Sequence, residues 1–321
     1  MTTTGVPRTQ FERSMRMLRS GLGPRIVEWL ADPAVVEIML NPDGRLWLDR
    51  LGEGLVATSE TISPDVGERI IRLVAHHVGG TVHGAAPRIS AELPEGGERF
   101  EGLMPPIVTA PAFAIRKPAS KIFSLADYVA SGIMSEDQAA VLEAAVASRA
   151  NILVAGGTGS GKTTLVNALL AEVARSEDRV ILIEDTRELQ CSTPNLVAMR
   201  TKDEVATLRD LVRSALRLRP DRIPIGEVRG PEALDLIKAW GTGHPGGIGT
   251  IHAGSVRGAL RRLEQLIQEA VVTVPRALIA ETVNLVAVLV RDGAGRRLAE
   301  LAWIDGLDVH GDFKIETKGD R

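Results

Sequence analysis

Residues 151–170 read NILVAGGTGSGKTTLVNALL, and this stretch decides the fold of the C-terminal part of the chain. It opens with a short apolar run typical of a buried strand, continues as a glycine-rich turn and ends in an apolar helical segment. The turn contains the pattern G-x-x-x-x-G-K-T at Gly156–Thr163, in the strand–turn–helix context that this pattern requires. Glycines let backbone N–H groups turn inward onto phosphates, and the helix N-terminus adds the positive end of its dipole. The stretch therefore predicts a nucleoside-triphosphate site.

Two side chains of this motif have expected roles of their own. Lys162 is expected to reach the β- and γ-phosphates of ATP, and Thr163 to offer its hydroxyl to Mg²⁺. ATP and Mg²⁺ are the predicted cofactors. The residues expected to bind them from this motif are Gly156, Gly157, Thr158, Gly159, Ser160, Gly161, Lys162, Thr163 and Thr164.

Beyond the motif, short β-rich runs alternate with helical segments. The runs are VILIE (180–184), RIPIGE (222–227) and GIGTI (247–251), and residues 285–305 are expected to close the chain as a hairpin. Such alternation indicates a doubly wound α/β domain with a largely parallel sheet. Pro224 interrupts one of these strands and predicts an irregular stretch there, because proline lacks the N–H that a sheet needs.

The N-terminal part has a different pattern. VVEIMLNPDGRLWLDR (35–50) is typical of a hairpin with its turn at Asn41–Gly44, and SPDVGERIIRLVAHHVGG (63–80) of an amphipathic helix. These elements predict an α+β domain with an antiparallel sheet.

The boundary between the two patterns is expected just before a helix start. Ser135 and Gln138 form a capping box that opens a helix to about Arg149. We therefore predict a smaller α+β domain at 1–120, a linker at 121–134 and an α/β domain at 135–321.

Composition excludes several classes of protein. The 321 residues carry 38 basic and 41 acidic side chains, a formal charge of −3, which disfavours a general nucleic-acid or anionic-membrane binder. Cys191 is the only cysteine, so no internal disulfide is expected. No apolar run reaches the roughly 18 residues of a membrane span, and the N-terminus lacks the apolar core of a signal peptide. A cytoplasmic or membrane-peripheral location is expected.

Carboxylates that follow the β-rich runs are candidates for holding Mg²⁺ or orienting water. Glu184 and Asp185 follow one run and Glu227 ends another, at the strand ends where ligands bind in such sheets. Glu227 is the better candidate for orienting the attacking water, because Gly226 before it leaves room for a nucleotide. Asp221 lies at the opposite end of its run and is expected to be structural.

Four segments in this order resemble the nucleotide motifs of the type II/IV secretion traffic ATPases. They are GGTGSGKTT (156–164), ILIEDTRELQ (181–190), LRLRPDRIPIGEVRGPEA (216–233) and GHPGGIGTIHA (243–253), similar to Walker A, the Asp box, Walker B and the His box. GERFEGLMPPIVTAPAFAIRKPA (97–119) looks like the type IV secretion branch, and in detail the chain is similar to TrbB-type conjugal-transfer ATPases.

The resemblance implies a RecA-like P-loop domain in a hexameric ring, with nucleotide between the two domains and Arg99 and Arg116 directed to its phosphates. It also implies that Glu184 supports metal or water, and that His252 reads the γ-phosphate from a glycine-rich segment that lies close to nucleotide. His244 remains open between a functional and a structural role. The implied partners are further copies of this chain and inner-membrane components of a conjugation or type IV secretion apparatus, with no specific nucleic-acid binding.

The implied function is Mg²⁺-dependent ATP hydrolysis that powers conjugative pilus assembly or DNA transfer from the cytoplasmic face of the inner membrane. A pilus-retraction or type II secretion motor on the same core is the main alternative. A DNA-binding P-loop ATPase and a nucleotide-gated scaffold that scarcely hydrolyses ATP are further alternatives.

Overall fold

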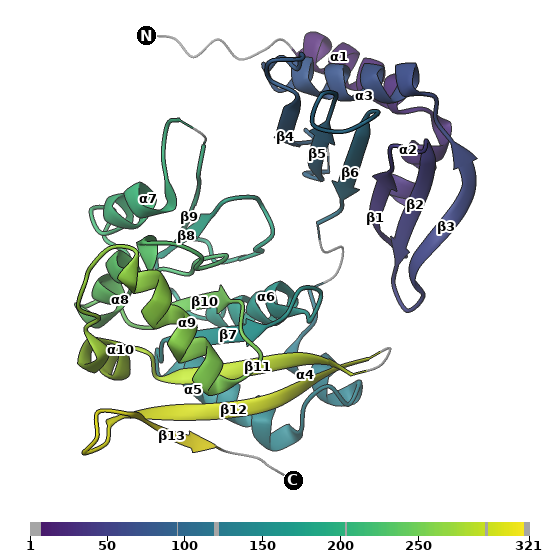
Figure 1. The fold of residues 1–321 in the computed structure, drawn as a ribbon. Helices are drawn as coiled ribbons and strands as arrows, with labels where there is room; N and C mark the ends of the chain where they lie inside the picture. Colours follow the sequence, from purple (N-terminus) through teal and green to yellow (C-terminus); the bar gives the residue numbers. More distant parts are fainter. Residues whose placement is uncertain (1–7, 95, 119–121, 203, 293–294, 318–321) are drawn as a thin grey trace. The chain divides into compact units, whose positions relative to one another are not determined.

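The computed structural model describes residues 8–94, 96–118, 122–202, 204–292 and 295–317. They fall into two compact units, Met1–Ser120 and Lys121–Arg321 (Figure 1). Unit 1 has one six-stranded sheet and one hydrophobic cluster; unit 2 has a five-stranded sheet, a two-stranded sheet and two hydrophobic clusters. Within these described ranges, no helix combines the length and apolar composition needed to cross a membrane.

Unit 1 is built on a six-stranded sheet whose neighbouring strands are all antiparallel, in the order β3-β2-β1-β6-β5-β4. Helix α1 packs against α3. Its helices are α1 (Arg8–Leu22), α2 (Pro24–Ala31) and α3 (Pro64–His77), and its strands are β1 (Val35–Leu40), β2 (Arg45–Arg50), β3 (Gly54–Thr61), β4 (Arg88–Glu92), β5 (Arg99–Leu103) and β6 (Ala112–Arg116).

Two local predictions for unit 1 are confirmed. Strands β1 and β2 pair as an antiparallel hairpin, and Gly44 at its turn has a positive φ. Helix α3 is amphipathic: of the face expected at Ile70, Leu73, Val74 and Val78, Ile70 and Val74 are buried together with Ile71, whereas Val78, after the last turn, is exposed.

Unit 2 carries the P-loop motif within an α/β arrangement, which confirms the predicted α/β class. Its helices are α4 (Leu125–Ala130), α5 (Glu136–Ala147), α6 (Lys162–Val173), α7 (Leu208–Ala215), α8 (Glu232–Gly241), α9 (Val256–Gln268) and α10 (Arg276–Thr282). Its strands are β7 (Ile152–Gly156), β8 (Val180–Glu184), β9 (Leu196–Arg200), β10 (Ile248–Ile251), β11 (Leu285–Asp292), β12 (Gly295–Leu307) and β13 (Phe313–Thr317).

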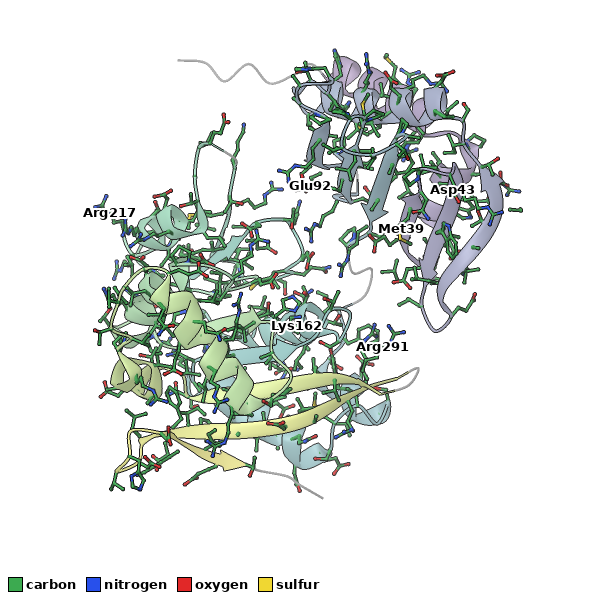
Figure 2. All side chains as sticks on the ribbon, in the orientation of Figure 1. Met39, Asp43, Glu92, Lys162, Arg217 and Arg291 are labelled. Atoms are coloured by element: carbon green, nitrogen blue, oxygen red, sulfur yellow. The ribbon has the colours of Figure 1, made fainter. Side chains whose placement is uncertain are left out.

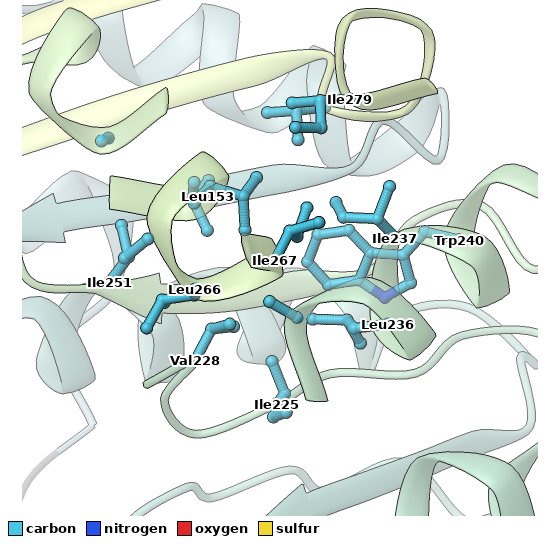
Figure 3. Packing of buried hydrophobic residues seen from close by; sticks show 14 of the residues in the cluster. Leu153, Ile225, Val228, Leu236, Ile237, Trp240, Ile251, Leu266, Ile267 and Ile279 are labelled. Carbon is cyan, nitrogen blue, oxygen red and sulfur yellow. The ribbon is translucent and has the colours of Figure 1, made fainter. Parts of the chain in front are cut away.

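Strand β7 lies between β10 and β11 and is parallel to both. Its residues alternate between two buried clusters: Ile152 and Val154 face α4, α5 and α6, while Leu153 and Ala155 face α7 to α10. Figure 3 shows the second of these clusters around Trp240. Burial on both faces explains why β7 reads as an unbroken apolar run in the sequence.

The predicted strand at 222–227 is present only as isolated parallel bridges. Ile225 bridges to Ile183 of β8 on one side and to Gly249 of β10 on the other, so this segment joins the two strands without forming a regular strand itself. Pro224 has no N–H to donate to a neighbour, which accounts for the irregularity.

The end of the chain forms the predicted hairpin, because β11 and β12 pair antiparallel, and β13 then adds a further antiparallel strand. The stretch expected as a linker contains helix α4. Leu125 and Tyr128 of α4 are buried in the core of unit 2, so ordered structure begins before Ser135. The capping box of Ser135 and Gln138 at the start of α5 is confirmed.

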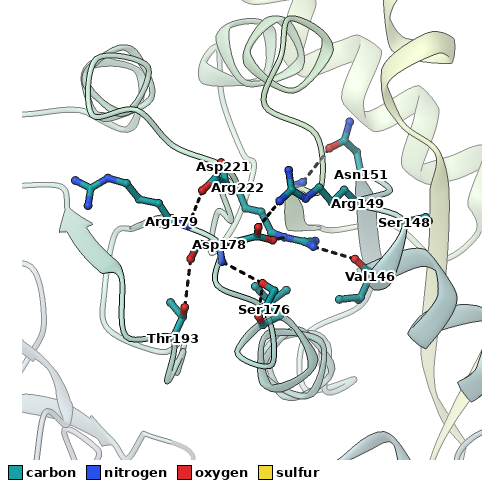
Figure 4. A network of polar contacts seen from close by, with 12 residues as sticks. Val146, Ser148, Arg149, Asn151, Ser176, Asp178, Arg179, Thr193, Asp221 and Arg222 are labelled. Atoms are coloured by element: carbon teal, nitrogen blue, oxygen red, sulfur yellow. Dashed lines mark hydrogen bonds and ion pairs between the residues drawn. The ribbon is translucent and has the colours of Figure 1, made fainter.

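Figure 4 shows a largely buried ionic network next to the starts of β7 and β8, whereas the P-loop follows the end of β7. Asp178 pairs with Arg222 at 2.6 Å and also with Arg149, while Arg222 donates to the carbonyl of Val146. Beside the network, the carboxylate of Asp221 accepts the backbone N–H of Arg179 at 2.7 Å, in keeping with its predicted structural role. These contacts tie α5, the start of β8 and the start of the irregular segment together.

Candidate nucleotide site

The P-loop connects the end of β7 to the start of α6. Gly161, immediately before the helix, has a φ of 95°, a conformation that side-chain-bearing residues rarely adopt. A Cβ on Gly156 would lie 2.6 Å from the carbonyl oxygen of Leu289 in β11, so no larger residue fits there. The first turn of α6 therefore points its N–H groups at the space above the loop, which is the anion-binding arrangement of a helix N-terminus.

Lys162 lies at the mouth of this loop. Its ammonium donates to the carbonyl oxygens of Gly156 and Gly157, each at 3.0 Å, and the residue is only 8% exposed. A buried positive charge held by the loop's own carbonyls is placed to bind an anion that the N–H groups attract.

Thr163 is in contact with an acid that the sequence reasoning did not single out. Its hydroxyl donates to a carboxylate oxygen of Glu188 at 3.2 Å, and the main chain of Glu188 accepts from the side chain of Asn167. The sequence does show Glu188, the third acid of this stretch after Glu184 and Asp185, but it does not show which of the three faces the P-loop.

Glu184 binds the main chain of the turn that follows it. It is 3% exposed, and one of its oxygens accepts the backbone N–H groups of Glu188 and Leu189 at 2.8 and 2.6 Å. Burial is the main cause that raises the pKa of Glu184 to about 7; the charge of Glu188 adds a smaller rise, and the two N–H groups oppose it. Glu184 thus braces the turn that carries Glu188, whereas Glu188 itself contacts Thr163.

Asp185, the other acid of this strand end, is paired elsewhere. The carboxylate of Asp185 accepts a hydrogen bond from the hydroxyl of Thr201 at 2.8 Å and forms an ion pair with Arg229. Arg229 was not among the residues expected from the sequence. The pair borders a cavity of about 620 Å³.

Glu227, the last residue of the irregular segment, and His252, the residue after β10, lie at the same edge of the sheet. The Nε2 atom of His252 is 3.0 Å from Oε1 of Glu227, and both side chains remain partly exposed. The hydroxyl of Thr250 binds the carbonyl oxygen of Gly226 at 2.6 Å and fixes the two segments together. The structure therefore brings together two residues that the sequence reasoning selected separately.

His244 lies at the other end of β10, where its Nδ1 is 2.9 Å from the carbonyl oxygen of Pro220. This contact favours the structural reading of His244. The glycines between the two histidines also have a packing reason: a Cβ on Gly247 would lie 2.1 Å from the ring of Trp240, and one on Gly249 would lie 2.8 Å from Ile225. They let α8 and the segment that carries Ile225 approach β10 closely.

Arg99 and Arg116 are in unit 1, directly opposite each other on β5 and β6. Partners across antiparallel strands point to the same face, so two like charges lie side by side there. Glu37 is the partner of Arg116 on β1; burial raises the pKa of Glu37, and the charges of Arg116 and Arg99 oppose that rise. This acidic neighbour offsets part of the repulsion between the arginines.

Comparison with known proteins gives this geometry a context. The family model of the type II/IV secretion system protein matches residues 87–300. The conjugal transfer protein TrbB of Rhizobium radiobacter is 50% identical over 92% of this chain and 91% of its own length. The chain belongs to the type II/IV secretion system protein family. A probable conjugal transfer protein TrbB of Sinorhizobium fredii (strain NBRC 101917 / NGR234) is 48% identical over 95% of this chain and 94% of its own, which makes the chain a TrbB-type member of that family.

Solved structures share the fold of this family member. The pilus retraction motor PilT with bound ADP aligns with a TM-score of 0.62 at 20% identity, over 92% of this chain and 83% of PilT. The ATPase DotB of Legionella pneumophila aligns with a TM-score of 0.59 at 19% identity, over 97% of this chain and 84% of DotB.

Proposed function

We propose that this TrbB-type protein hydrolyses ATP at the P-loop of unit 2 and converts the reaction into motion that drives conjugative or type IV secretion. The observation that carries the proposal is the contact between Glu227 and His252 at the edge of the sheet where the P-loop also lies. Family membership supports an ATPase of this class.

The roles proposed for the side chains follow from their contacts. Lys162 and the N–H groups of the α6 N-terminus bind the β- and γ-phosphates. Glu227 orients a water for in-line attack on the γ-phosphorus; the bond to the β–γ bridging oxygen breaks and releases ADP and phosphate. His252, in hydrogen-bond range of Glu227, sets the direction of that carboxylate and registers whether the γ-phosphate is present.

The residues present fit Mg²⁺, which prefers oxygen ligands and takes one or two protein groups together with substrate phosphates. We assign its protein contacts to Thr163 and Glu188, in place of the expected Thr163 and Glu184, because Glu188 is the acid in contact with the Thr163 hydroxyl. When bound, the ion would neutralise charge on the β- and γ-phosphates. Glu184 then acts by positioning Glu188 through its main chain.

We further propose a hexameric ring in which Arg99 and Arg116 contribute to nucleotide sites, at the cytoplasmic face of the inner membrane and in contact with components of a secretion apparatus. The adjacent charges of Arg99 and Arg116 support this, because two arginines side by side gain when a polyphosphate lies between them. The named conjugal transfer relatives support the biological setting.

Steady-state ATPase activity per molecule, measured against protein concentration for the wild type, Arg116→Gln and Arg45→Gln, tests the ring. Arg45, an exposed arginine on β2 of the same sheet, is the matched control. We expect activity per molecule to rise steeply with concentration for the wild type and Arg45→Gln and to stay low for Arg116→Gln. A flat dependence in the wild type would contradict a site completed by assembly.

A further inference from the structure

The β11–β12 hairpin runs alongside the phosphate loop. In the parallel pairing of β11 with β7, Leu289 is the partner of Gly156, the last residue of β7. Strand β11 therefore continues past the point where β7 turns into the loop, and carries Arg291 beyond it. Strand β12 returns from that point with Arg296 and Arg297 near its start.

Arg296 contacts the loop directly. Its Nε–H donates to the carbonyl oxygen of Gly159 at 3.2 Å, and its Cδ would lie 3.1 Å from a Cβ on Gly161. The side chain thus lies against the loop at Gly159 and Gly161. The positive charge of Arg296 also acts on Tyr128 of α4. Burial raises the pKa of the Tyr128 phenol, and the charge of Arg296 opposes that rise.

Arg291 is the cross-strand partner of Arg296. Leu289 and Leu298 are also partners, and both are buried in the cluster on the side of α4, α5 and α6. Because side chains alternate along a strand, Arg291 and Arg296 point to that same side. Two like charges directly opposite each other repel, so this arrangement gains from an anion bound between or beside them. Figure 2 shows Arg291 at the end of the hairpin.

The order of strands places this pair on one flank of the phosphate site. Glu227 and His252 are on the β10 side of β7, whereas the hairpin is on the β11 side. If the γ-phosphate of a nucleotide lies near Glu227, the rest of its polyphosphate extends toward the opposite flank.

We propose that Arg296, assisted by Arg291, binds the α- and β-phosphates of ATP or ADP from the β11 side of the P-loop. The proposal rests on the proposed function, since it needs a nucleotide at this loop. Arginine suits the role, because its fork can donate to a carbonyl and a phosphate at once. ADP and ATP both contain the α- and β-phosphates. The contact of Arg296 with them therefore strengthens the binding of ADP, of ATP and of the transition state to a similar extent. Its loss should raise KM and leave kcat nearly unchanged.

Equilibrium binding of ADP at several salt concentrations tests this assignment in Arg296→Gln, Arg291→Gln and Arg297→Gln. Glutamine keeps much of the stem that packs on Gly161 while removing the charge. Arg297 is the matched control, because it is the next residue and pairs with Val290, which packs on the other face of the sheet. We expect Arg296→Gln to weaken ADP binding roughly tenfold and Arg291→Gln about threefold. We expect Arg297→Gln to weaken it less than about twofold, and Arg296→Gln to lower the salt dependence more than Arg297→Gln does.

Lys162→Ala separates this inference from the proposed function. If Lys162→Ala binds ADP as tightly as the wild type, the nucleotide site itself is wrong. If Lys162→Ala loses ADP but Arg296→Gln behaves like Arg297→Gln, the nucleotide site stands and the role of Arg296 is overturned. Weaker ADP binding by Arg296→Gln with an unchanged salt dependence, or with a lower thermal stability than Arg297→Gln, would also overturn it, because it would indicate packing in place of an ionic contact.

Discussion

Nε2 of His252 lies 3.0 Å from Oε1 of Glu227, although the two residues end different segments of the sheet. The hydroxyl of Thr250, two residues before His252, donates to the carbonyl oxygen of Gly226, the residue before Glu227. This hydrogen bond joins the two segments and holds the two side chains near each other, at the edge of the sheet where the P-loop begins. A carboxylate held in this way is oriented before substrate arrives, which reduces the cost of arranging it in the transition state.

This contact predicts that Glu227 and His252 act as a unit. We expect His252→Ala to lower kcat about tenfold, because the carboxylate loses the partner that orients it. In Glu227→Gln the same His252→Ala change should lower kcat much less, so the effects will not add. Steady-state kinetics of the two single variants and the double variant measure this. Fully additive effects would contradict a shared role.

Glu184 and Glu188, two of the three acids of the Asp box, are expected to differ in their effect on magnesium dependence. Glu188 contacts the Thr163 hydroxyl, whereas Glu184 contacts backbone N–H groups of the next turn. Glu188→Gln should therefore raise the Mg²⁺ concentration for half-maximal activity about tenfold. Glu184→Gln should raise it clearly less, because an amide oxygen can still accept the two backbone N–H groups. A magnesium titration of ATPase activity in both variants measures the two concentrations. A larger increase for Glu184→Gln than for Glu188→Gln would indicate that Glu184, and not Glu188, contacts the metal.

The burial of Glu184 predicts a pH dependence of stability. Its pKa rises from 4.5 to about 7 on folding, so the folded protein keeps the proton more tightly than the unfolded chain. As pH rises from 4.5 through 7, the unfolded chain ionises first and stability is lost, by about 1–3 kcal/mol. Glu184→Gln cannot titrate, so its stability relative to the wild type should increase between about pH 5 and about pH 8.

Chemical denaturation at the two pH values measures that change. Glu143→Gln, an exposed position on α5, is the control and should give nearly the same difference from the wild type at both. A stability difference for Glu184→Gln that stays constant or falls with pH would contradict the account of Glu184.

Side chains larger than hydrogen in the glycine-rich run before His252 are expected to lower stability, because the ring of Trp240 packs against Gly247. Gly247→Ala adds a methyl group 2.1 Å from the indole ring, which should cost about 1–3 kcal/mol of unfolding free energy. Gly254→Ala, two residues after His252, has open space around it and should cost far less. Urea unfolding of both variants provides the comparison, and equal stabilities would show that Gly247 is not required by packing.

Much of unit 2 could be predicted because its signals are local. The strand, glycine turn and helix around Lys162 follow from composition and spacing, and the same holds for the capping box at Ser135. Pro224 has no backbone N–H, so the sequence already predicts an irregular strand at 222–227. The bridges of this segment to β8 and β10 depend on the arrangement of the whole sheet, which the sequence does not show.

The remaining features depend on contacts between distant segments. Whether Glu184 or Glu188 faces Thr163 is decided by the turn between them, and the sequence does not reveal how that turn folds. The contact of Arg296 with Gly159 requires the register of β11 on β7, which no local pattern encodes.

The most direct test of the central claim is ATP hydrolysis by Glu227→Gln, measured together with its affinity for ATP. If Glu227 orients the attacking water, kcat should fall by about 100-fold or more while the dissociation constant for ATP stays within about threefold of the wild type. Hydrolysis at the wild-type rate in a variant that still binds ATP would contradict the assignment of Glu227, and with it the proposed mechanism.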